Sequence, residues 1–263
     1  TSHFLGQNFS KSANIQFVDK DEKRKFGWTT SWGVSTRLIG GLIMTHADDD
    51  GLRVPPRLSP IHVVILPITF KADNPSEIEE WVNTLAKEIS AKTYDGAPIR
   101  VQVDRRDLRG GEKNWNWIKK GAPLRVEVGP RDFEKKSVMV ARRDQSPKEK
   151  KSMPRSLFIE NIENILSEIQ DGMLATAKKY RDENTKKIDN KDDFYSFFKG
   201  MESEIDGGFA LTHFNGSCEL EEKIKKDLAV TVRCIPINDE DGPGKCAFTG
   251  EDSVQRVLWG KSY

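Results

Sequence analysis

Residues 29–44 read TTSWGVSTRLIGGLIM, and no other segment of the chain is as informative. A turn of small residues leads into Arg37, and the almost wholly apolar stretch after it predicts a helix over about 34–44. Arg37 is the only charged residue between Thr29 and His46. A lone guanidinium beside a buried helix is costly to desolvate unless it meets an anionic or planar partner. A nucleotide offers both, through its phosphates and its adenine, whereas the alternative is a core helix that begins with a surface arginine.

The composition limits the function classes that need to be considered. The 263 residues carry a formal net charge of +1 and 32% of them are charged, so nucleic-acid binding must come from local basic patches. Mean hydropathy is −0.62, and no run approaches the roughly 20 apolar residues of a membrane span, which predicts a soluble protein without a membrane partner. Three cysteines at wide spacing do not form a disulfide framework, and they favour a reducing, cytoplasmic setting.

Short strands, the apolar helix and a linker are predicted for residues 1–60. Segments 15–18 and 25–30 are strand candidates on either side of a charged turn. The proline-rich run PPRLSP at 55–60 interrupts regular structure and is typical of a linker.

From residue 61 the pattern changes to alternating strands and helices. The continuous apolar run IHVVILPI at 61–68 is typical of a strand covered on both faces. A helix is predicted to begin near Pro75, with apolar residues at helical spacing: Ile78, Trp81, Val82, Leu85 and Ile89. Three further strands and a short helix are predicted at 99–103, 124–128, 137–141 and 113–120. This order predicts a layered α/β domain over 61–150 with a largely parallel or mixed sheet.

A basic, loose segment at 146–152 predicts a second domain boundary. A long amphipathic helix is expected over 157–179, and a smaller helix over 190–198 carries three phenylalanines. Strands and one more helix are then predicted at 207–214, 218–227, 230–235 and 254–259. Together they predict a small α+β domain over 151–263.

Several segments outside residues 29–44 resemble one enzyme family. They are TSHFLGQNF at 1–9, THADDDGL at 45–52, PPRLSP at 55–60, GAPLRVEVGPRD at 121–132, RCIP at 233–236 and the closing Tyr263. The chain resembles the prolyl-tRNA synthetases, which are class II aminoacyl-tRNA synthetases, in their archaeal and eukaryotic-type subgroup. Residues 29–44 resemble the third class II motif, and the resemblance covers essentially the whole chain.

The resemblance implies a fold and an activity. It implies the end of a class II antiparallel-sheet catalytic domain at 1–60, an anticodon-binding domain at 61–150 and a small C-terminal domain at 151–263. The implied reaction is ATP-dependent activation of L-proline to prolyl-adenylate and its transfer to tRNA(Pro), in a cytoplasmic homodimer. Motifs 1 and 2 have no counterpart here, so we expect an incomplete, inactive part of the enzyme, with Mg²⁺ ligands largely outside this chain.

A second hypothesis belongs to another class: a non-catalytic tRNA-binding or regulatory paralogue derived from such a synthetase. A protein kept only for RNA binding has no need of an ATP-binding arginine and a proline slot. The presence of His3, Trp32 and Arg37 therefore favours the enzyme.

The resemblance also implies roles for individual residues in the catalytic part. Arg37 matches the catalytic motif arginine that packs on the adenine or reaches the γ-phosphate, and Thr1 and Ser35 match further ATP contacts. His3, Trp32 and Gly33 match the proline pocket, where an indole beside a glycine makes a narrow slot for a pyrrolidine ring. The alternatives are a satisfied strand histidine and an ordinary core tryptophan. Tyr263 matches a C-terminal residue that folds back towards the catalytic domain.

The region matching the anticodon-binding surface combines cations with aromatic rings, as RNA-loop recognition requires. The segment KNWNWIKK at 113–120 interleaves the two kinds of side chain. The expected tRNA contacts are Lys113, Trp117, Lys119, Arg125, Glu127, Arg131 and Asp132. The alternative is an exposed amphipathic helix with a solvated charge run.

The cysteines argue against a metal site. Many relatives carry four zinc-binding cysteines in the C-terminal domain, and this chain has Asn215, Leu220, Cys246 and Thr249 at those positions. A single ligand of four cannot hold a tetrahedral structural zinc, so we expect no zinc and three free thiols.

Overall fold

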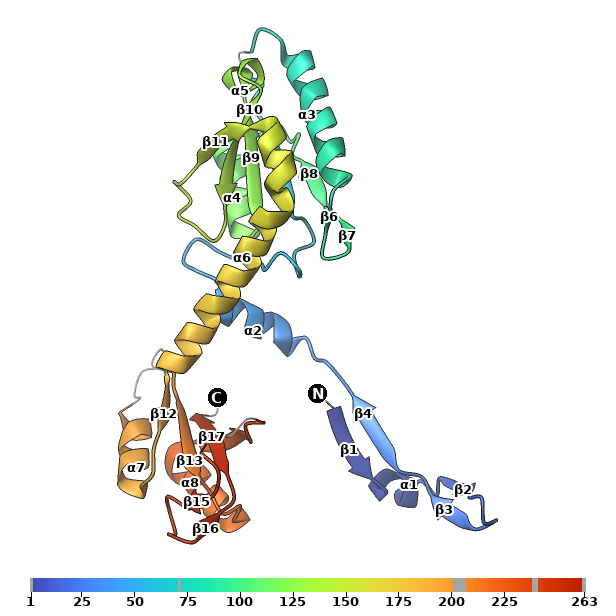
Figure 1. Cartoon of the computed structure of the whole chain (residues 1–263), viewed down its shortest axis with the longest axis vertical. Coiled ribbons are helices and arrows are strands. Elements are labelled where there is room, and N and C mark those ends of the chain that lie inside the picture. The colour runs from blue at the N-terminus through green and yellow to red at the C-terminus, as the bar shows by residue number, and fades with distance from the viewer. Residues whose placement is uncertain (1, 71, 201–206, 238–240, 262–263) are drawn as a thin grey trace. The chain divides into compact units, whose positions relative to one another are not determined.

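The computed structural model describes residues 2–70, 72–200, 207–237 and 241–261. The chain divides into two compact units, Thr1–Gln170 and Asp171–Tyr263. Each unit combines helices with β-sheet (Figure 1), which confirms the mixed α/β and α+β class expected from the sequence. The division falls later than the boundary expected at 150, and the three-domain division stays a prediction.

The N-terminal segment is built from short strands and one longer helix. β1 (Ser2–Gly6) pairs antiparallel with β4 (Thr29–Trp32), and β2 (Gln16–Val18) pairs with β3 (Arg24–Phe26). The short helix α1 (Asn8–Ser12) connects β1 to β2, and the apolar helix α2 spans Arg37–His46. The helix begins later than predicted because the amides of Leu38 and Ile39 close tight turns onto the carbonyls of Ser35 and Thr36.

Many apolar side chains of this segment are exposed, although the sequence pattern of α2 is that of a core helix. No residue of α2 is buried, and Trp32 and Val34 are both 78% exposed. The other exposed apolar residues of the segment include Phe4, Phe9, Phe17, Trp28, Leu38, Ile39 and Met44. Apolar side chains gathered at this density are typical of a surface that another polypeptide segment covers.

A five-stranded mixed sheet forms the core of the first unit, in the order β11-β10-β9-β5-β8. β5 (Val63–Pro67) lies between two parallel neighbours, β8 (Val101–Val103) and β9 (Leu124–Val128). β10 (Ser137–Arg142) runs antiparallel to β9 and to β11 (Lys151–Pro154). The basic segment at 146–152 therefore leads into an edge strand of this sheet.

Helices cover both faces of the sheet (Figure 1). α3 (Pro75–Ser90) packs on β5 and β8 through Ile78, Val82, Leu85 and Ile89, all of which are fully buried. The opposite face carries α4 (Gly110–Lys119), whose Trp117 packs with Val64 and Leu66 of β5. Burial of each such Val, Leu or Ile contributes roughly 1.5 to 3 kcal/mol, so these two layers stabilise the unit.

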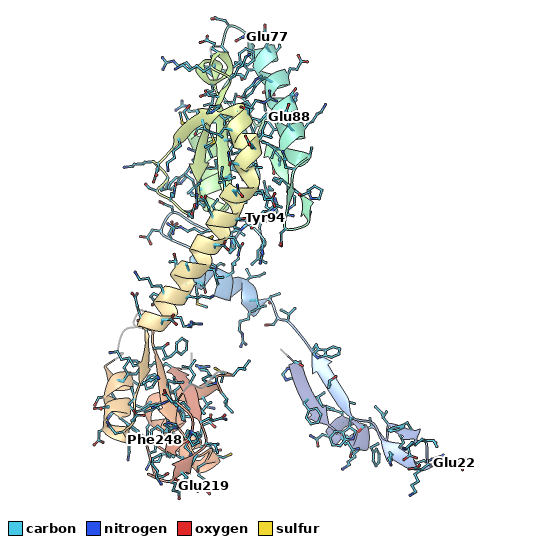
Figure 2. The ribbon with its side chains drawn as sticks, in the orientation of Figure 1. Glu22, Glu77, Glu88, Tyr94, Glu219 and Phe248 are labelled. Carbon is cyan, nitrogen blue, oxygen red and sulfur yellow. The ribbon has the colours of Figure 1, made fainter. Side chains whose placement is uncertain are left out.

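The start of the long helix α6 (Arg155–Glu183) is tied to α3. The Arg155 guanidinium lies 4.8 Å from the centre of the Trp81 ring and pairs with Glu88 at 3.0 Å. Trp81 in turn meets Phe133 of α5 (Pro130–Glu134) edge-to-face. Glu88 lies on the outer side of α3 in Figure 2. A small hairpin of β6 (Thr93–Tyr94) and β7 (Ala97–Pro98), not predicted from the sequence, follows α3.

The second unit contains a four-stranded sheet in the order β12-β13-β17-β14. Its strands are β12 (Thr185–Lys187), β13 (Phe209–His213), β17 (Arg256–Lys261) and β14 (Val230–Cys234). α7 (Lys191–Lys199), α8 (Cys218–Leu228) and the short hairpin of β15 (Gly244–Lys245) and β16 (Asp252–Ser253) complete it. Phe194 and Trp259 are fully buried at its centre, with ring centres 5.4 Å apart and edge-to-face. Phe248, labelled in Figure 2, packs beside them. Within the described ranges, no helix is both long and apolar enough to cross a bilayer.

A buried histidine fixes the proline-rich linker to the sheet domain. The His62 side chain is fully buried, its Nδ1 accepts from the Arg100 amide at 3.2 Å, and its Nε2 lies 3.1 Å from the Pro56 carbonyl oxygen. Burial, and then the positive charge of Arg100, lower the pKa of His62 to about 4. The imidazole is therefore neutral in the folded state at neutral pH.

We predict that His62 makes the first unit less stable in acid. Because the folded-state pKa lies below the ordinary value of 6.5, the unfolded chain binds more protons between about pH 4 and pH 6.5. Stability is fully present above pH 6.5 and falls by up to about 1.4 kcal/mol per pH unit as the pH drops towards 4. Urea denaturation across this range, compared with His62→Gln, measures the effect. An equal pH dependence in the variant would contradict it.

Candidate nucleotide and RNA sites

The first candidate site lies at the start of α2. Arg37 is the first residue of the helix, and its side chain is exposed. Within the described part of the chain, the Arg37 guanidinium makes no hydrogen bond or ion pair. A helix N-terminus presents free amide groups and a positive dipole end, which disfavours a cation there unless an anion is bound. The combination of this arginine with a helix N-terminus suits a phosphate group.

The turn from β4 to α2 brings some of the predicted site residues together. Gly33 and Ser35 lie in the same exposed turn as Arg37. Trp32 pairs with Ser2 in the β1–β4 ribbon and His3 pairs with Ser31, so adjacent residues alternate between the two faces. The ribbon by itself therefore does not gather His3 and Trp32 into one pocket. Thr1 and Tyr263 lie outside the described residues.

The second candidate site lies on the α4 face of the sheet domain. Trp117 is only 4% exposed, and its indole N–H donates to the Asp104 carboxylate at 2.8 Å. Arg106 holds the same carboxylate through Nε and Nη2, and Lys113 Nζ donates to the Asp104 backbone carbonyl at 3.3 Å. Hydrogen bonds from Arg106 hold the pKa of Asp104 well below its ordinary value. Trp117 and Lys113 thus fix the loop after β8, and Trp117 has little surface to offer a base.

The exposed ring of α4 is Trp115 rather than Trp117. Trp115 is 42% exposed, and the ammonium of Lys119 lies 6.0 Å from its ring centre. Lys120 lies over the other ring, 4.6 Å from Trp117. An exposed indole flanked by lysines can stack a base and meet its phosphate at the same time. The segment at 113–120 singled out from the sequence contains both rings, and the structure shows that Trp115 is the exposed one.

Arg125 is a fully buried cation on the same face. Its Nε donates to Asn114 Oδ1 of α4 at 2.7 Å, while Nη1 and Nη2 have no hydrogen-bond partner among the described residues. Burial, and then the nearby charge of Arg143, lower the pKa of Arg125 to about 10, so it stays protonated at neutral pH. Glu127, on the same strand face, accepts from Lys150 Nζ at 2.5 Å. At this depth the guanidinium has no surface to offer a base, so Arg125 supports the α4 face from beneath, as Trp117 does.

Arg131 and Asp132 follow at the end of β9. Arg131 is exposed at the start of α5. The Asp132 carboxylate accepts from the Gly129 amide at 3.0 Å and thereby caps this helix. The structure therefore brings Lys113, Arg125 and Glu127 to one face of the sheet and gives Asp132 a structural role in the adjoining loop.

Two of the four positions considered for zinc in the sequence, Asn215 and Thr249, form a hydrogen-bonded polar cluster with Glu251. Asn215 Nδ2 donates to Glu251 Oε2 at 2.5 Å, and the Glu251 amide donates to Thr249 Oγ1 at 3.3 Å. Cys218 and Cys234 are exposed, whereas Cys246 is buried. Across residues 2–70, 72–200, 207–237 and 241–261, no three His, Cys, Asp or Glu side chains are grouped to hold a metal ion.

Comparisons with known proteins identify relatives of both parts of the chain. The family model "Prolyl-tRNA synthetase, C-terminal" matches residues 198–263, and the model "Anticodon binding domain" matches residues 62–165. All of this chain aligns with proline–tRNA ligase 2 of Anaeromyxobacter dehalogenans at 51% identity and with proline–tRNA ligase of Bdellovibrio bacteriovorus at 50% identity. It covers 53% and 52% of those proteins, so it spans about half the length of the curated relatives it matches.

A solved structure gives the same answer for the fold. The crystal structure of prolyl-tRNA synthetase from Cryptosporidium parvum complexed with L-proline and AMP matches with a TM-score of 0.84 at 34% identity. The match covers all of this chain and 54% of that one. From the family models and these matches together, the chain belongs to the prolyl-tRNA synthetase family.

Proposed function

We propose that this chain is part of a proline–tRNA ligase, which activates L-proline with ATP and transfers it to tRNA(Pro). Arg37 carries the proposal, because its guanidinium has no partner among the described residues at the first turn of α2, inside a segment whose apolar side chains are exposed. The rest of the catalytic domain would cover those side chains. The cytoplasmic location and the homodimeric state expected from the sequence belong to the same proposal.

In the proposed reaction, the chain's own residues bind and orient the reactants. Arg37 holds the nucleotide by charge and by stacking, with Ser35 and Thr1 as further ATP contacts. His3, Trp32 and Gly33 form part of the proline pocket. Mg²⁺, held largely by residues outside this chain, would neutralise phosphate charge. Positioning and charge neutralisation are sufficient for adenylate formation, since the carboxylate of proline is itself the nucleophile.

For tRNA binding, we propose the α4 face of the sheet domain. Lys113, Lys119, Arg125, Glu127, Arg131 and Asp132 are its polar groups, and Trp115 is its stacking ring. Trp117 supports this surface through Asp104 and does not itself contact RNA. Because these groups all lie within residues 104–132, RNA binding is the activity that this chain can have alone. That observation also favours the second candidate function, a non-catalytic tRNA-binding protein.

We predict that Trp115→Ala weakens binding of a tRNA(Pro) transcript by roughly 1 to 3 kcal/mol, because one stacked base is lost. Lys119→Ala is expected to make the RNA-binding constant less dependent on salt, by about the amount that one phosphate contact contributes. Fluorescence anisotropy over a salt series measures both. Lys87→Ala on α3, across the sheet, is the control and should change neither quantity. If Lys87→Ala and Lys119→Ala reduced the salt dependence of RNA binding equally, the α4 face would not be the RNA-binding surface.

We predict that Arg37→Ala abolishes proline-dependent ATP–pyrophosphate exchange in the complete enzyme but leaves tRNA binding intact. Loss of a charge-assisted contact to the nucleotide costs roughly 2 to 4 kcal/mol of transition-state stabilisation. Arg24→Ala, which removes another exposed arginine of the same segment, is the matched control. Exchange at the wild-type rate in the Arg37 variant would refute the nucleotide role.

We predict that the purified chain carries no stoichiometric zinc. Asn215, Leu220 and Thr249 offer no thiolate or imidazole, and Cys246 alone cannot hold the ion. Elemental analysis by mass spectrometry after dialysis measures the metal content. About one tightly held zinc per chain would show that other residues supply a site.

A further inference from the structure

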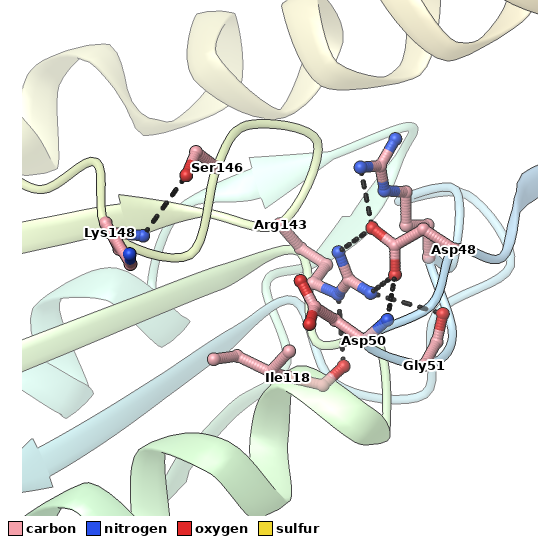
Figure 3. Close-up of polar contacts among 8 residues, drawn as sticks. Asp48, Asp50, Gly51, Ile118, Arg143, Ser146 and Lys148 are labelled. Atoms are coloured by element: carbon pink, nitrogen blue, oxygen red, sulfur yellow. Dashed lines mark hydrogen bonds and ion pairs between the residues drawn. The ribbon is translucent and has the colours of Figure 1, made fainter.

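The turn that follows α2 is joined to the α4 helix by one buried arginine (Figure 3). Arg143, directly after β10, is 2% exposed. Its Nη1 and Nη2 donate to the two oxygens of Asp48 at 2.9 and 2.5 Å, and Nη2 also donates to the Gly51 carbonyl at 3.1 Å. Its Nε donates to the Ile118 carbonyl in the last turn of α4 at 3.0 Å. The planar guanidinium of Arg143 thus forms hydrogen bonds to two segments that are far apart in the sequence.

The Asp48 carboxylate is fully engaged in this arrangement. Besides Arg143, it pairs with Arg53 at 2.6 Å, and it accepts from the Asp50 amide at 3.1 Å within its own turn. The hydrogen bonds from Arg143 hold the pKa of Asp48 well below its ordinary value. The carboxylate is therefore ionised at neutral pH, and the link is a charge pair with defined geometry.

Backbone contacts make the same junction rigid. The Leu52 amide donates to the Lys119 carbonyl at 3.0 Å, and the Val54 amide donates to the Gly121 carbonyl at 3.3 Å. Gly51 has a φ of +130°, and a Cβ there would come within 2.6 Å of Lys119 Cα. Gly121 has a φ of +73°, and a Cβ there would come within 2.8 Å of the Leu52 carbonyl oxygen. The two backbones are therefore in direct contact, which only glycine allows at these two positions.

This junction connects the two candidate sites. α2 begins with Arg37 and ends at His46, just before the turn that Asp48 starts. α4 carries Trp115 and Lys119, the proposed RNA contacts, and ends where Arg143 bonds it. We propose that Arg143 is a positioning residue that couples RNA engagement on α4 to the placement of α2 and hence of Arg37. This inference rests on the proposed RNA-binding function of α4.

Hydrogen exchange of the whole chain, with and without a saturating stem–loop RNA that carries a proline anticodon, tests the coupling. We expect the RNA to slow exchange in α4 and to change exchange in α2 by roughly 5-fold or more, the lower end of ordinary coupling between sites. In Arg143→Lys, which keeps the charge but loses the planar guanidinium, the α4 response should remain and the α2 response should disappear. Gly51→Ala adds a Cβ that would push the two backbones apart and leaves the Asp48–Arg143 side chains unchanged. In this variant too, the α4 response should remain and the α2 response should disappear.

Two matched controls separate coupling from loss of structure. Arg142→Lys changes the neighbouring arginine, which pairs with Asp144 and Glu168 instead. Gly96→Ala changes a glycine with a φ of +77° that has open space around it. Both should keep the α2 response. An α2 response that is absent in the wild type despite protection of α4, or that persists in Arg143→Lys and Gly51→Ala, would overturn the coupling. A wild-type chain that does not bind the RNA at all would overturn the proposed RNA-binding function and the coupling with it.

Discussion

The buried guanidinium of Arg143 is the interaction on which the arrangement of the first unit depends. The turn and linker at residues 48–54 join the N-terminal segment to the sheet domain. Arg143 bonds Asp48 on one side and the Ile118 carbonyl on the other. Removing one partner from a buried charge pair leaves the other unsolvated, which costs about 3 to 5 kcal/mol. The junction is therefore held firmly, although it contains little apolar surface.

The two candidate sites differ in how many of their side chains are packed or hydrogen-bonded within this chain. The α4 face is assembled by β5, β9 and β10, and its polar groups are fixed by bonds such as those of Trp117 and Lys113 to Asp104. The segment around Arg37 has its backbone in place, but its apolar residues are exposed and its cation has no described partner. The sequence spans about half the length of the curated relatives it matches.

Elements whose burial is visible in a local pattern could be predicted from the sequence. The run 61–68 is apolar at every position except His62, and β5 is indeed a central strand. The helix predicted from Pro75 was correct because Ile78, Val82, Leu85 and Ile89 mark one face. The basic segment 146–152 gave no sign of β11, since a four-residue edge strand of sequence KSMP has no apolar alternation and is recognised only by its pairing with β10. Which of Trp115 and Trp117 is exposed depends on Asp104, a contact across elements that no local pattern contains. The Asp48–Arg143 pair could not be predicted for the same reason, because it joins residues from different elements.

Reconstitution tests the central claim most directly. This chain would be combined with a separately produced polypeptide that supplies the remaining half of a related prolyl-tRNA synthetase, and proline-dependent ATP–pyrophosphate exchange would be measured. We predict exchange in the mixture and none with either piece alone, because the exposed apolar surface around α2 would pack against the added polypeptide. A stable, stoichiometric complex of the two pieces that binds ATP and proline but shows no exchange would contradict it.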